Sequence, residues 1–247
     1  ALANTPNIKR FWNSHPHTRL DASGESVGLP HGEDGNTETG HLNIGAGHIV
    51  YQDLPRINMS IADGSFFQNQ AFLAAAQHVR THQSTLHLLG LIGAGGVHSN
   101  IEHLYALIHF ANQGKLTNVA IHLMTDGRDS PPTSSLTYIT QLKQKLQSTG
   151  VGSIASLMGR FYAMDRDQRW ERTHKAYLAL TAGEGHRSPS AEQAISDAYQ
   201  SGKSDEFIEP TLVTDDQGNP RSLIKENDAV IFFNFRIDRP RQLTKAF

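Results

Sequence analysis

Short apolar runs alternate with longer amphipathic segments from about residue 70 to the end of the chain. Four of these runs have the length and composition of buried strands, namely 86–92, 119–124, 153–158 and 229–233. Strands that alternate with helices of about 10–15 residues are typical of βαβ units. The pattern therefore predicts an α/β fold with a mostly parallel sheet that is flanked by helices.

The segments between these runs place apolar residues three or four positions apart, which is the spacing of one helix face. They predict helices at 69–81, 100–112, 134–147, 169–180 and 190–201, the last with Ser190 as its N-cap. Residues 1–50 lack such periodicity, and five glycines between positions 29 and 47 indicate backbone that passes close to other atoms. Residues 51–58 are interpreted as a linker to the rest of the chain.

The composition excludes several classes of protein. The 247 residues have a formal net charge of −2, so no overall positive field favours nucleic acid or an anionic membrane surface. The lack of cysteine excludes disulfides and thiolate chemistry and is consistent with a reducing cytosol. No apolar run approaches the ~20 residues of a membrane-spanning helix, and the first residues do not resemble a signal peptide. We therefore expect a cytoplasmic protein.

Charged residues follow all four predicted strands at the point where each strand ends. Parallel strands joined by right-handed crossovers end at the same edge of a sheet, and ligands of open α/β sheets bind at that edge. We therefore expect the residues that follow the strands to meet there: His98, Arg128, Asp129, Arg160, Arg166, Arg236 and Arg239.

Five arginines at one edge would repel each other by on the order of a few kcal/mol unless an anion lay between them. Arginine binds phosphate or carboxylate through a planar fork of donors and keeps its charge. The arrangement indicates a site for a small, multiply charged anion. In such a site Asp129 could orient an arginine or accept from a hydroxyl, and His98 could donate to phosphate or transfer a proton. The alternative is that each arginine forms an ordinary surface ion pair.

Thr37 lies in a glycine-bounded segment that leads into a possible helix. The N-terminus of a helix presents free N–H groups to a phosphate, and a hydroxyl there can attack phosphorus if a metal lowers its pKa. From the residues alone two interpretations stay open: Thr37 is a nucleophile, or it is the N-cap of the helix.

Taken together, these motifs resemble the 2,3-bisphosphoglycerate-independent phosphoglycerate mutases of the alkaline phosphatase superfamily. The resembling segments keep the order of that family: 1–6, 28–30, 35–47, 50–54, 95–99, 126–129, 159–167, 169–172 and 233–236. The resemblance implies a metal-dependent glycolytic isomerase that interconverts 3-phosphoglycerate and 2-phosphoglycerate through a phosphoenzyme. It also implies an alkaline-phosphatase-like domain with two divalent metal ions, usually Mn²⁺, and an inserted phosphotransferase domain.

By motif, the resemblance places Thr37 at the position of the nucleophile, where the residue also ligates a metal. It assigns substrate binding to His98, Arg128, Asp129, Arg160, Arg166, Arg236 and Arg239. Residues 1–51 would be an incomplete N-terminal part of the phosphatase-like domain, and 52–247 a phosphotransferase domain that lacks its C-terminal end. The other metal ligands and a substrate-binding lysine would then lie outside the chain, so we expect a monomer that is inactive by itself.

Two positions depart from the family pattern. Thr37 stands where the family has Ser, and its extra methyl group restricts χ1; Ala94 stands where the family usually has Asp. Two other functions stay open. The chain could bind phosphoglycerate without turnover, or it could be related to metal-dependent phosphatases and phosphopentomutases, which Thr37 favours.

Overall fold

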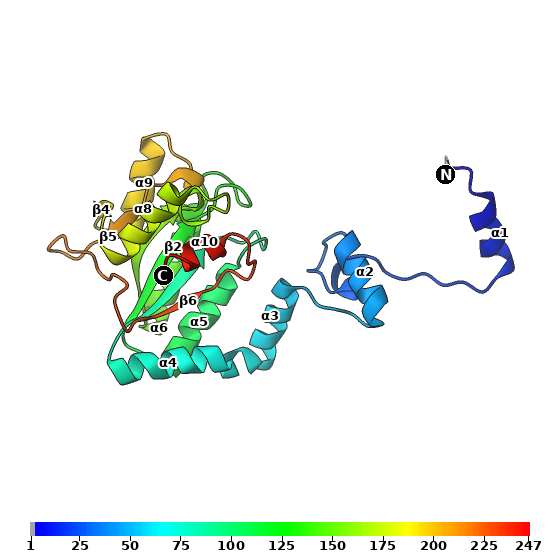
Figure 1. The fold of residues 1–247 in the computed structure, drawn as a ribbon, viewed down its shortest axis with the longest axis horizontal. Helices are drawn as coiled ribbons and strands as arrows, with labels where there is room; N and C mark the ends of the chain where they lie inside the picture. The colour runs from blue at the N-terminus through cyan, green and yellow to red at the C-terminus, as the bar shows by residue number, and fades with distance from the viewer. Residues whose placement is uncertain (1–2) are drawn as a thin grey trace. The chain divides into compact units, whose positions relative to one another are not determined.

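The computed structural model describes residues 3–247, so the first two residues of the resembling segment 1–6 lie outside the described part. The chain divides into two compact units, Ala1–Pro55 and Arg56–Phe247 (Figure 1). The described part of the first unit contains α1 (Pro6–Ser14), a 3₁₀ turn at Gly24–Val27, α2 (Thr37–Ala46) and the first residues of α3 (Asp53–Asp63).

Backbone segments of the first unit approach each other closely. A Cβ atom on Gly35 would lie 1.7 Å from the carbonyl oxygen of Ala22, so only glycine fits at this crossing. The Asn43 amide then links two further segments, because its Nδ2 donates to Val27 O (2.9 Å) and its Oδ1 accepts from Val50 N (2.7 Å). The close approach predicted for the glycine-rich stretch is confirmed at Gly35.

Within the described residues, the second unit contains a six-stranded sheet in the order β4-β5-β3-β2-β1-β6. Four strands are parallel to one another: β1 (Leu86–Leu91), β2 (Val119–Thr125), β3 (Ser153–Gly159) and β6 (Ala229–Phe232). The two short strands β4 (His186–Ser188) and β5 (Thr211–Val213) are parallel to each other, and β5 is antiparallel to β3. The predicted fold class, an α/β fold with a mostly parallel sheet, is confirmed.

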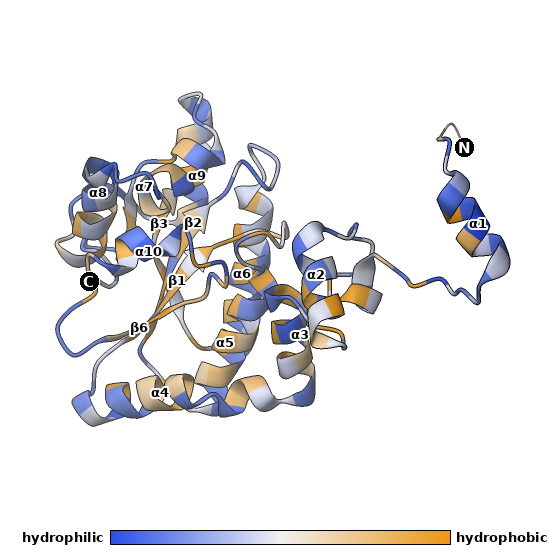
Figure 2. Cartoon of the chain, turned by 45° about the vertical axis from the view of Figure 1, so that its right-hand side comes forward, coloured by the Kyte–Doolittle hydropathy of each residue, from blue (hydrophilic) through white to orange (hydrophobic). Residues whose placement is uncertain are grey.

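Helices cover both faces of the sheet, because strands that are buried on both sides need an apolar partner on each. One face packs against α4 (Gln70–His82), α5 (Ile101–Gln113), α6 (Ser135–Thr149) and α9 (Ala191–Gln200). The other face packs against α7 (Arg160–Ala163), α8 (Trp170–Thr181) and α10 (Pro240–Thr244). Figure 2 shows apolar residues concentrated on the strands. None of the helices between residues 3 and 247 has the length and apolarity that a bilayer crossing requires.

The predicted helices form close to the expected bounds, and Ser190 caps α9 by accepting from Gln193 N at 3.1 Å. Two predictions differ in part from the structure. The boundary between the two units lies inside the predicted linker 51–58, but this segment contains the start of α3, whose Pro55 lies in the first turn, where no intrahelical N–H bond is lost. The run at 229–233 is not a buried strand, because β6 is the edge strand of the sheet and Val230 is 38% exposed.

A chain of buried polar side chains crosses the sheet beneath α8. The Asp228 carboxylate accepts from His87 Nε2 at 3.1 Å, and His87 Nδ1 lies 2.8 Å from His122 Nε2. His122 Nδ1 in turn lies 2.8 Å from the Ser156 hydroxyl. An irregularity in the pairing of β2 and β3 places Ser156, rather than its neighbour, opposite His122. Burial lowers the pKa of both histidines, so both rings are neutral at pH 7, and the hydrogen bonds link four neighbouring segments of the sheet.

Candidate functional site

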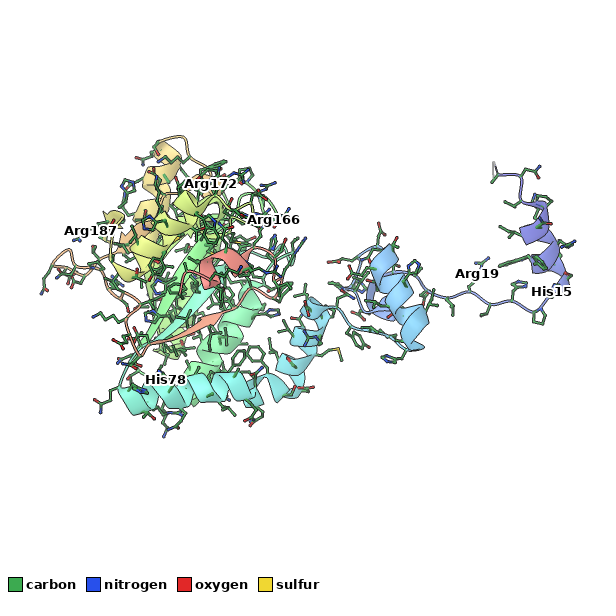
Figure 3. The ribbon with its side chains drawn as sticks, in the orientation of Figure 1. His15, Arg19, His78, Arg166, Arg172 and Arg187 are labelled. Atoms are coloured by element: carbon green, nitrogen blue, oxygen red, sulfur yellow. The ribbon has the colours of Figure 1, made fainter. Side chains whose placement is uncertain are left out.

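The carboxyl ends of the four parallel strands lie at one edge of the sheet. The strand β1 leads there into the loop 92–100, β2 into the loop 126–134, β3 directly into α7, and β6 into the segment 233–239. The structure therefore brings together on one side of the second unit all of the predicted substrate-binding residues: His98, Arg128, Asp129, Arg160, Arg166, Arg236 and Arg239. Figure 3 shows Arg166 on this side of the unit and Arg187 on the opposite side.

Arg160 lies at the buried centre of the site and is only 3% exposed. Its Nη1 donates to Asp126 Oδ1 at 2.5 Å and to Asp129 Oδ2 at 2.6 Å. Burial alone would lower the pKa of Arg160, but these two carboxylates raise it above its usual value. Asp126 also accepts from Arg128 N and Asp129 N, so that it shapes the loop after β2.

The main chain of residues 205–206 can approach the end of β3 only because residue 159 is glycine. A Cβ atom on Gly159 would lie 2.1 Å from the carbonyl oxygen of Glu206. Gly159 N also donates to Ile208 O at 2.7 Å. The segment 205–208 is therefore packed directly against the end of β3, where it brings Glu206 to the site.

His98 is buried between two carboxylates. Its Nε2 lies 3.7 Å from Asp129 Oδ2, and its Nδ1 lies 3.9 Å from Asp238 Oδ1. Burial, followed by the positive charge of Arg160, lowers the pKa of His98 to about 4, so the ring is neutral at pH 7. Its Nδ1 has no hydrogen-bond partner among the described residues. The main-chain oxygen of His98 accepts from Phe235 N at 3.0 Å, which holds the loops after β1 and β6 together.

Asp238 lies between two arginines from different strand ends. Its Oδ2 accepts from Arg166 Nη1 at 2.5 Å, and its Oδ1 lies 3.2 Å from Arg236 Nε. Both arginine side chains are about half exposed, at 46% and 50%. The remaining pair is Arg128 with Glu206, at 3.4 Å, and the Arg128 side chain is also about half exposed. These three arginines can therefore reach a molecule that arrives from solvent.

Arg239 differs from the other four arginines, because it forms no ion pair with another residue of the described part. Its Nη1 donates only to the main-chain oxygen of Met164 at 3.1 Å, and its Nε is buried without a partner. Burial lowers the pKa of Arg239, and the positive charges of Arg160, Arg166 and Arg128 lower it further. The site therefore has a positive potential that its own carboxylates do not fully offset.

The expectation that repulsion among the arginines requires a bound anion needs correction. Asp126, Asp129, Asp238 and Glu206 lie between the arginines and offset most of that repulsion. Separate surface ion pairs do not describe the arrangement either, because one pair is buried and one carboxylate is shared between two strand ends. The sequence offered a signal for Asp126 and Asp238, which directly follow a strand or stand between arginines. It offered none for Glu206, which lies 78 positions from Arg128.

Thr37 belongs to the first unit and is the first residue of α2. The N-cap of this helix is Asn36, whose Oδ1 accepts from Thr39 N at 2.9 Å, so the alternative that Thr37 is the N-cap was wrong. The Thr37 side chain is exposed and forms no hydrogen bond with another described residue. His41 is bonded to the main-chain oxygen of Thr37 at 2.7 Å. The hydroxyl at the start of α2 is thus available to a ligand.

The residues of the described part do not by themselves fit a two-metal site. Between residues 3 and 247, no group of three or more His, Asp or Glu side chains is arranged to hold a metal ion. Divalent metals in proteins need several such ligands, and Thr37 offers a single oxygen.

Comparisons with known proteins identify relatives of the chain. The chain is 54% identical over 242 residues to a 2,3-bisphosphoglycerate-independent phosphoglycerate mutase of Moorella thermoacetica, covering 98% of this chain and 47% of the relative. It is 53% identical over 246 residues to the corresponding mutase 1 of Methanosarcina barkeri, covering 99% and 48%. The chain spans about half the length of the curated relatives it matches.

A solved structure has the same fold. The phosphoglycerate mutase of Leishmania mexicana, determined at low cobalt concentration, superposes with a TM-score of 0.82 at 32% identity and covers 100% of this chain and 47% of its own. The family model described as "BPG-independent PGAM N-terminus" matches residues 57–247, which is most of the chain. The chain therefore belongs to the family of the N-terminal part of the BPG-independent phosphoglycerate mutases.

Proposed function

We propose that this chain is the substrate-holding part of a 2,3-bisphosphoglycerate-independent phosphoglycerate mutase, an isomerase that interconverts 3-phosphoglycerate and 2-phosphoglycerate. The names of its relatives support this reaction. The observation that carries the proposal is Arg239, a half-buried guanidinium that forms no ion pair in the described part and lies near three arginines from other segments, Arg128, Arg160 and Arg166. A phosphorylated acid would supply the negative charge that Arg239 lacks.

The proposed roles follow from exposure and charge. Arg128, Arg166 and Arg236 are exposed enough to turn toward the phosphate or the carboxylate of the substrate. Arg160 is fixed in the interior, where it orients Asp129, so that a carboxylate oxygen can accept from a glycerate hydroxyl. Neutral His98 would offer one ring N–H to phosphate, and its other nitrogen would accept a proton. Positioning and charge neutralisation are what phosphoryl transfer requires of a protein.

The exposed hydroxyl of Thr37 is the proposed acceptor of the phosphoryl group, and it would also be one ligand of a divalent metal, manganese by the family resemblance. We propose that residues 1–51 belong to the phosphatase-like domain and 52–247 to the phosphotransferase domain, in a cytoplasmic monomer. Any further metal ligands would come from outside this chain. The metal would lower the pKa of the hydroxyl, and α2 would present the N–H groups of its first turn to the phosphoryl oxygens.

Titration calorimetry tests the substrate-holding role on the chain as it stands. We expect saturable binding of one equivalent of 3-phosphoglycerate that weakens as the salt concentration rises, because the contacts are ionic. Glycerate, which lacks the phosphate, should bind much more weakly. Ribose 5-phosphate tests the relationship to phosphopentomutases, and tighter binding of this sugar would favour that alternative. If 3-phosphoglycerate does not bind, the proposal is wrong.

Turnover needs a separate experiment. We would replace the matching half of the Moorella thermoacetica relative with residues 1–247 and assay the chimaera for mutase activity with and without a chelator. We expect activity that is lost with the metal and lost in the Thr37→Val variant, and retained in Thr37→Ser. A chimaera that binds 3-phosphoglycerate but stays inactive with added manganese would support binding without turnover.

A further inference from the structure

The loop that carries Arg166 is held by a carboxylate that does not face the site. Asp165 is 5% exposed, and its Oδ2 accepts from Asp167 N at 3.1 Å and from Arg169 N at 2.9 Å. These two bonds close the turn in which Arg166 lies. The other oxygen of Asp165 lies 3.3 Å from Arg169 Nη1 and 3.6 Å from Arg172 Nη1, so its charge is balanced within the same segment.

A glutamine from another strand end completes this arrangement. Gln242 is 6% exposed and lies on α10, three residues after Arg239. Its Nε2 donates to Asp165 Oδ2 at 3.1 Å and to Thr173 Oγ1 at 2.7 Å. Its Oε1 accepts from Gln168 N at 3.1 Å. Every polar atom of this side chain is therefore occupied, and both of its ends hold the Arg166 loop.

We call Asp165 and Gln242 together the clamp. Two more contacts join the same two segments of the chain. Arg239 Nη1 donates to the main-chain oxygen of Met164, the residue before Asp165, at 3.1 Å. Arg166 itself is bonded to Asp238, the residue before Arg239. The segments 164–169 and 238–242 are thus joined by four hydrogen bonds, although they lie about 75 positions apart in the chain.

We infer that Gln242 is a positioning residue, which sets the separation of Arg166 and Arg239 and thereby the affinity of the site for a phosphorylated acid. The inference rests on the proposed function. Gln242 does not touch the ligand, since both ends of its amide are occupied in the interior. At neutral pH an amide meets both needs of the clamp, which are a donor toward the Asp165 carboxylate and an acceptor toward Gln168 N–H.

The test is calorimetry of the whole chain with 3-phosphoglycerate, combined with amide hydrogen exchange. In Gln242→Met, which keeps the length of the side chain but has no donor or acceptor, we expect the Kd to rise about tenfold. Exchange should become faster at Asp167, Gln168 and Arg169. Ser188→Ala is the matched control, because it removes a buried side-chain bond (Ser188 Oγ to Ser190 O, 2.9 Å) in β4, at the other end of the strand order. Its Kd should stay within about twofold of wild type.

The variant Gln242→Glu gives a readout that general destabilisation would not produce. At pH 7.5 the new carboxylate faces Asp165, and the Kd should rise more than in Gln242→Met. When the pH falls toward 5.5, a protonated glutamate again offers one donor and one acceptor, so the ratio of variant to wild-type Kd should fall toward one. If Gln242→Met does not fold, the pH dependence of the Gln242→Glu Kd decides whether Gln242 is a positioning residue.

Three results would overturn the inference: an unchanged Kd in folded Gln242→Met, a Kd ratio of Gln242→Glu that is independent of pH, or unchanged exchange at Gln168. Failure of the proposed function looks different, because the wild-type chain would then bind no 3-phosphoglycerate. Exchange at residues 167–169, compared between wild type and Gln242→Met, would still decide whether Gln242 holds the Arg166 loop.

Discussion

Arg160 and Asp129 are joined by a hydrogen bond of 2.6 Å between Nη1 and Oδ2, with Arg160 buried and the Asp129 side chain still 24% exposed. One end of the pair therefore belongs to the interior and the other to the surface of the site. The positive charge of Arg160 holds the pKa of Asp129 below its usual value against the effect of burial. Asp129 is thus a carboxylate of fixed orientation at neutral pH.

Removal of Arg160 should destabilise the fold strongly. In Arg160→Ala we expect the free energy of unfolding to fall by about 3–5 kcal/mol, because the buried Asp126 carboxylate loses its cation. Arg128→Ala is the control, since the Arg128 side chain is 55% exposed and its pair with Glu206 should contribute at most about 1 kcal/mol. Urea unfolding of both variants checks this, and equal losses would contradict it.

Arg239 should matter for binding and little for stability. Arg239→Met removes a guanidinium that its neighbours repel, so we expect the free energy of unfolding to change by less than about 1 kcal/mol. The affinity for 3-phosphoglycerate should fall at least about tenfold. Arg187→Met serves as the control, because Arg187 bonds only to Gly218 O and lies on the opposite side of the unit (Figure 3). Calorimetry that finds the same affinity in both variants would remove Arg239 from the site.

Acid should destabilise the second unit through its buried histidines. Burial lowers the pKa of His98 and His103 to about 4 and that of His122 to about 3. Histidine in the unfolded chain titrates near pH 6.5. Between about pH 6.5 and 4 the unfolded chain therefore binds more protons than the folded chain. The contribution of these histidines to the free energy of unfolding is therefore fully present above about pH 6.5 and is lost as the pH falls toward 4.

For a histidine whose pKa is about 4, the loss amounts to about 2 kcal/mol at pH 5. Urea unfolding at pH 7.5 and pH 5.0 measures it. In His103→Gln the difference between the two pH values should shrink by about this amount, since His103 no longer titrates. A stability that is the same at both pH values would falsify the assignment of neutral, buried rings.

The end of β3 should not tolerate a methyl group. In Gly159→Ala the new Cβ would meet the main-chain oxygen of Glu206, so we expect a loss of about 3 kcal/mol and weaker binding. Gly150→Ala is the comparison, because Gly150 has a φ of +69° and no atom within 4 Å of an added Cβ. That variant should lose only about 1 kcal/mol from backbone strain and keep its affinity. Thermal unfolding and calorimetry distinguish the two effects.

The parts of the fold that could be predicted are those in which burial acts on neighbouring residues. The strand β1 and the helix α5 show their periodicity because each must bury one or two faces of its own. The strands β4 and β5 have three residues each, too few for a pattern, and exist because they pair with each other and with β3. Helix α3 was missed because residues 51–58 were interpreted as a linker; its Pro55 is compatible with the first turn of a helix.

Some residues of the site could likewise be predicted from the sequence, and others could not. Residues that directly follow a strand could be predicted from topology alone, as His98 and Arg160 were, because all parallel strands end at one edge. The hydrogen-bond and ion-pair partners of these residues could not be predicted where the partner lies far away in the sequence. Glu206 reaches Arg128, and Gln242 reaches Asp165, only through the packing of segments about 75 positions apart.

The capping of α2 by Asn36 has a consequence for its neighbour. Since the Asn36 side chain caps the first turn, the helix does not need the side chain at position 37 as a cap. In the proposed function, the anchoring of the helix and the reactive hydroxyl thus fall to two adjacent residues, Asn36 and Thr37. A hydroxyl with or without a methyl group can occupy position 37 with the same backbone, so threonine in place of the serine that the family resemblance implies requires no rearrangement of the helix.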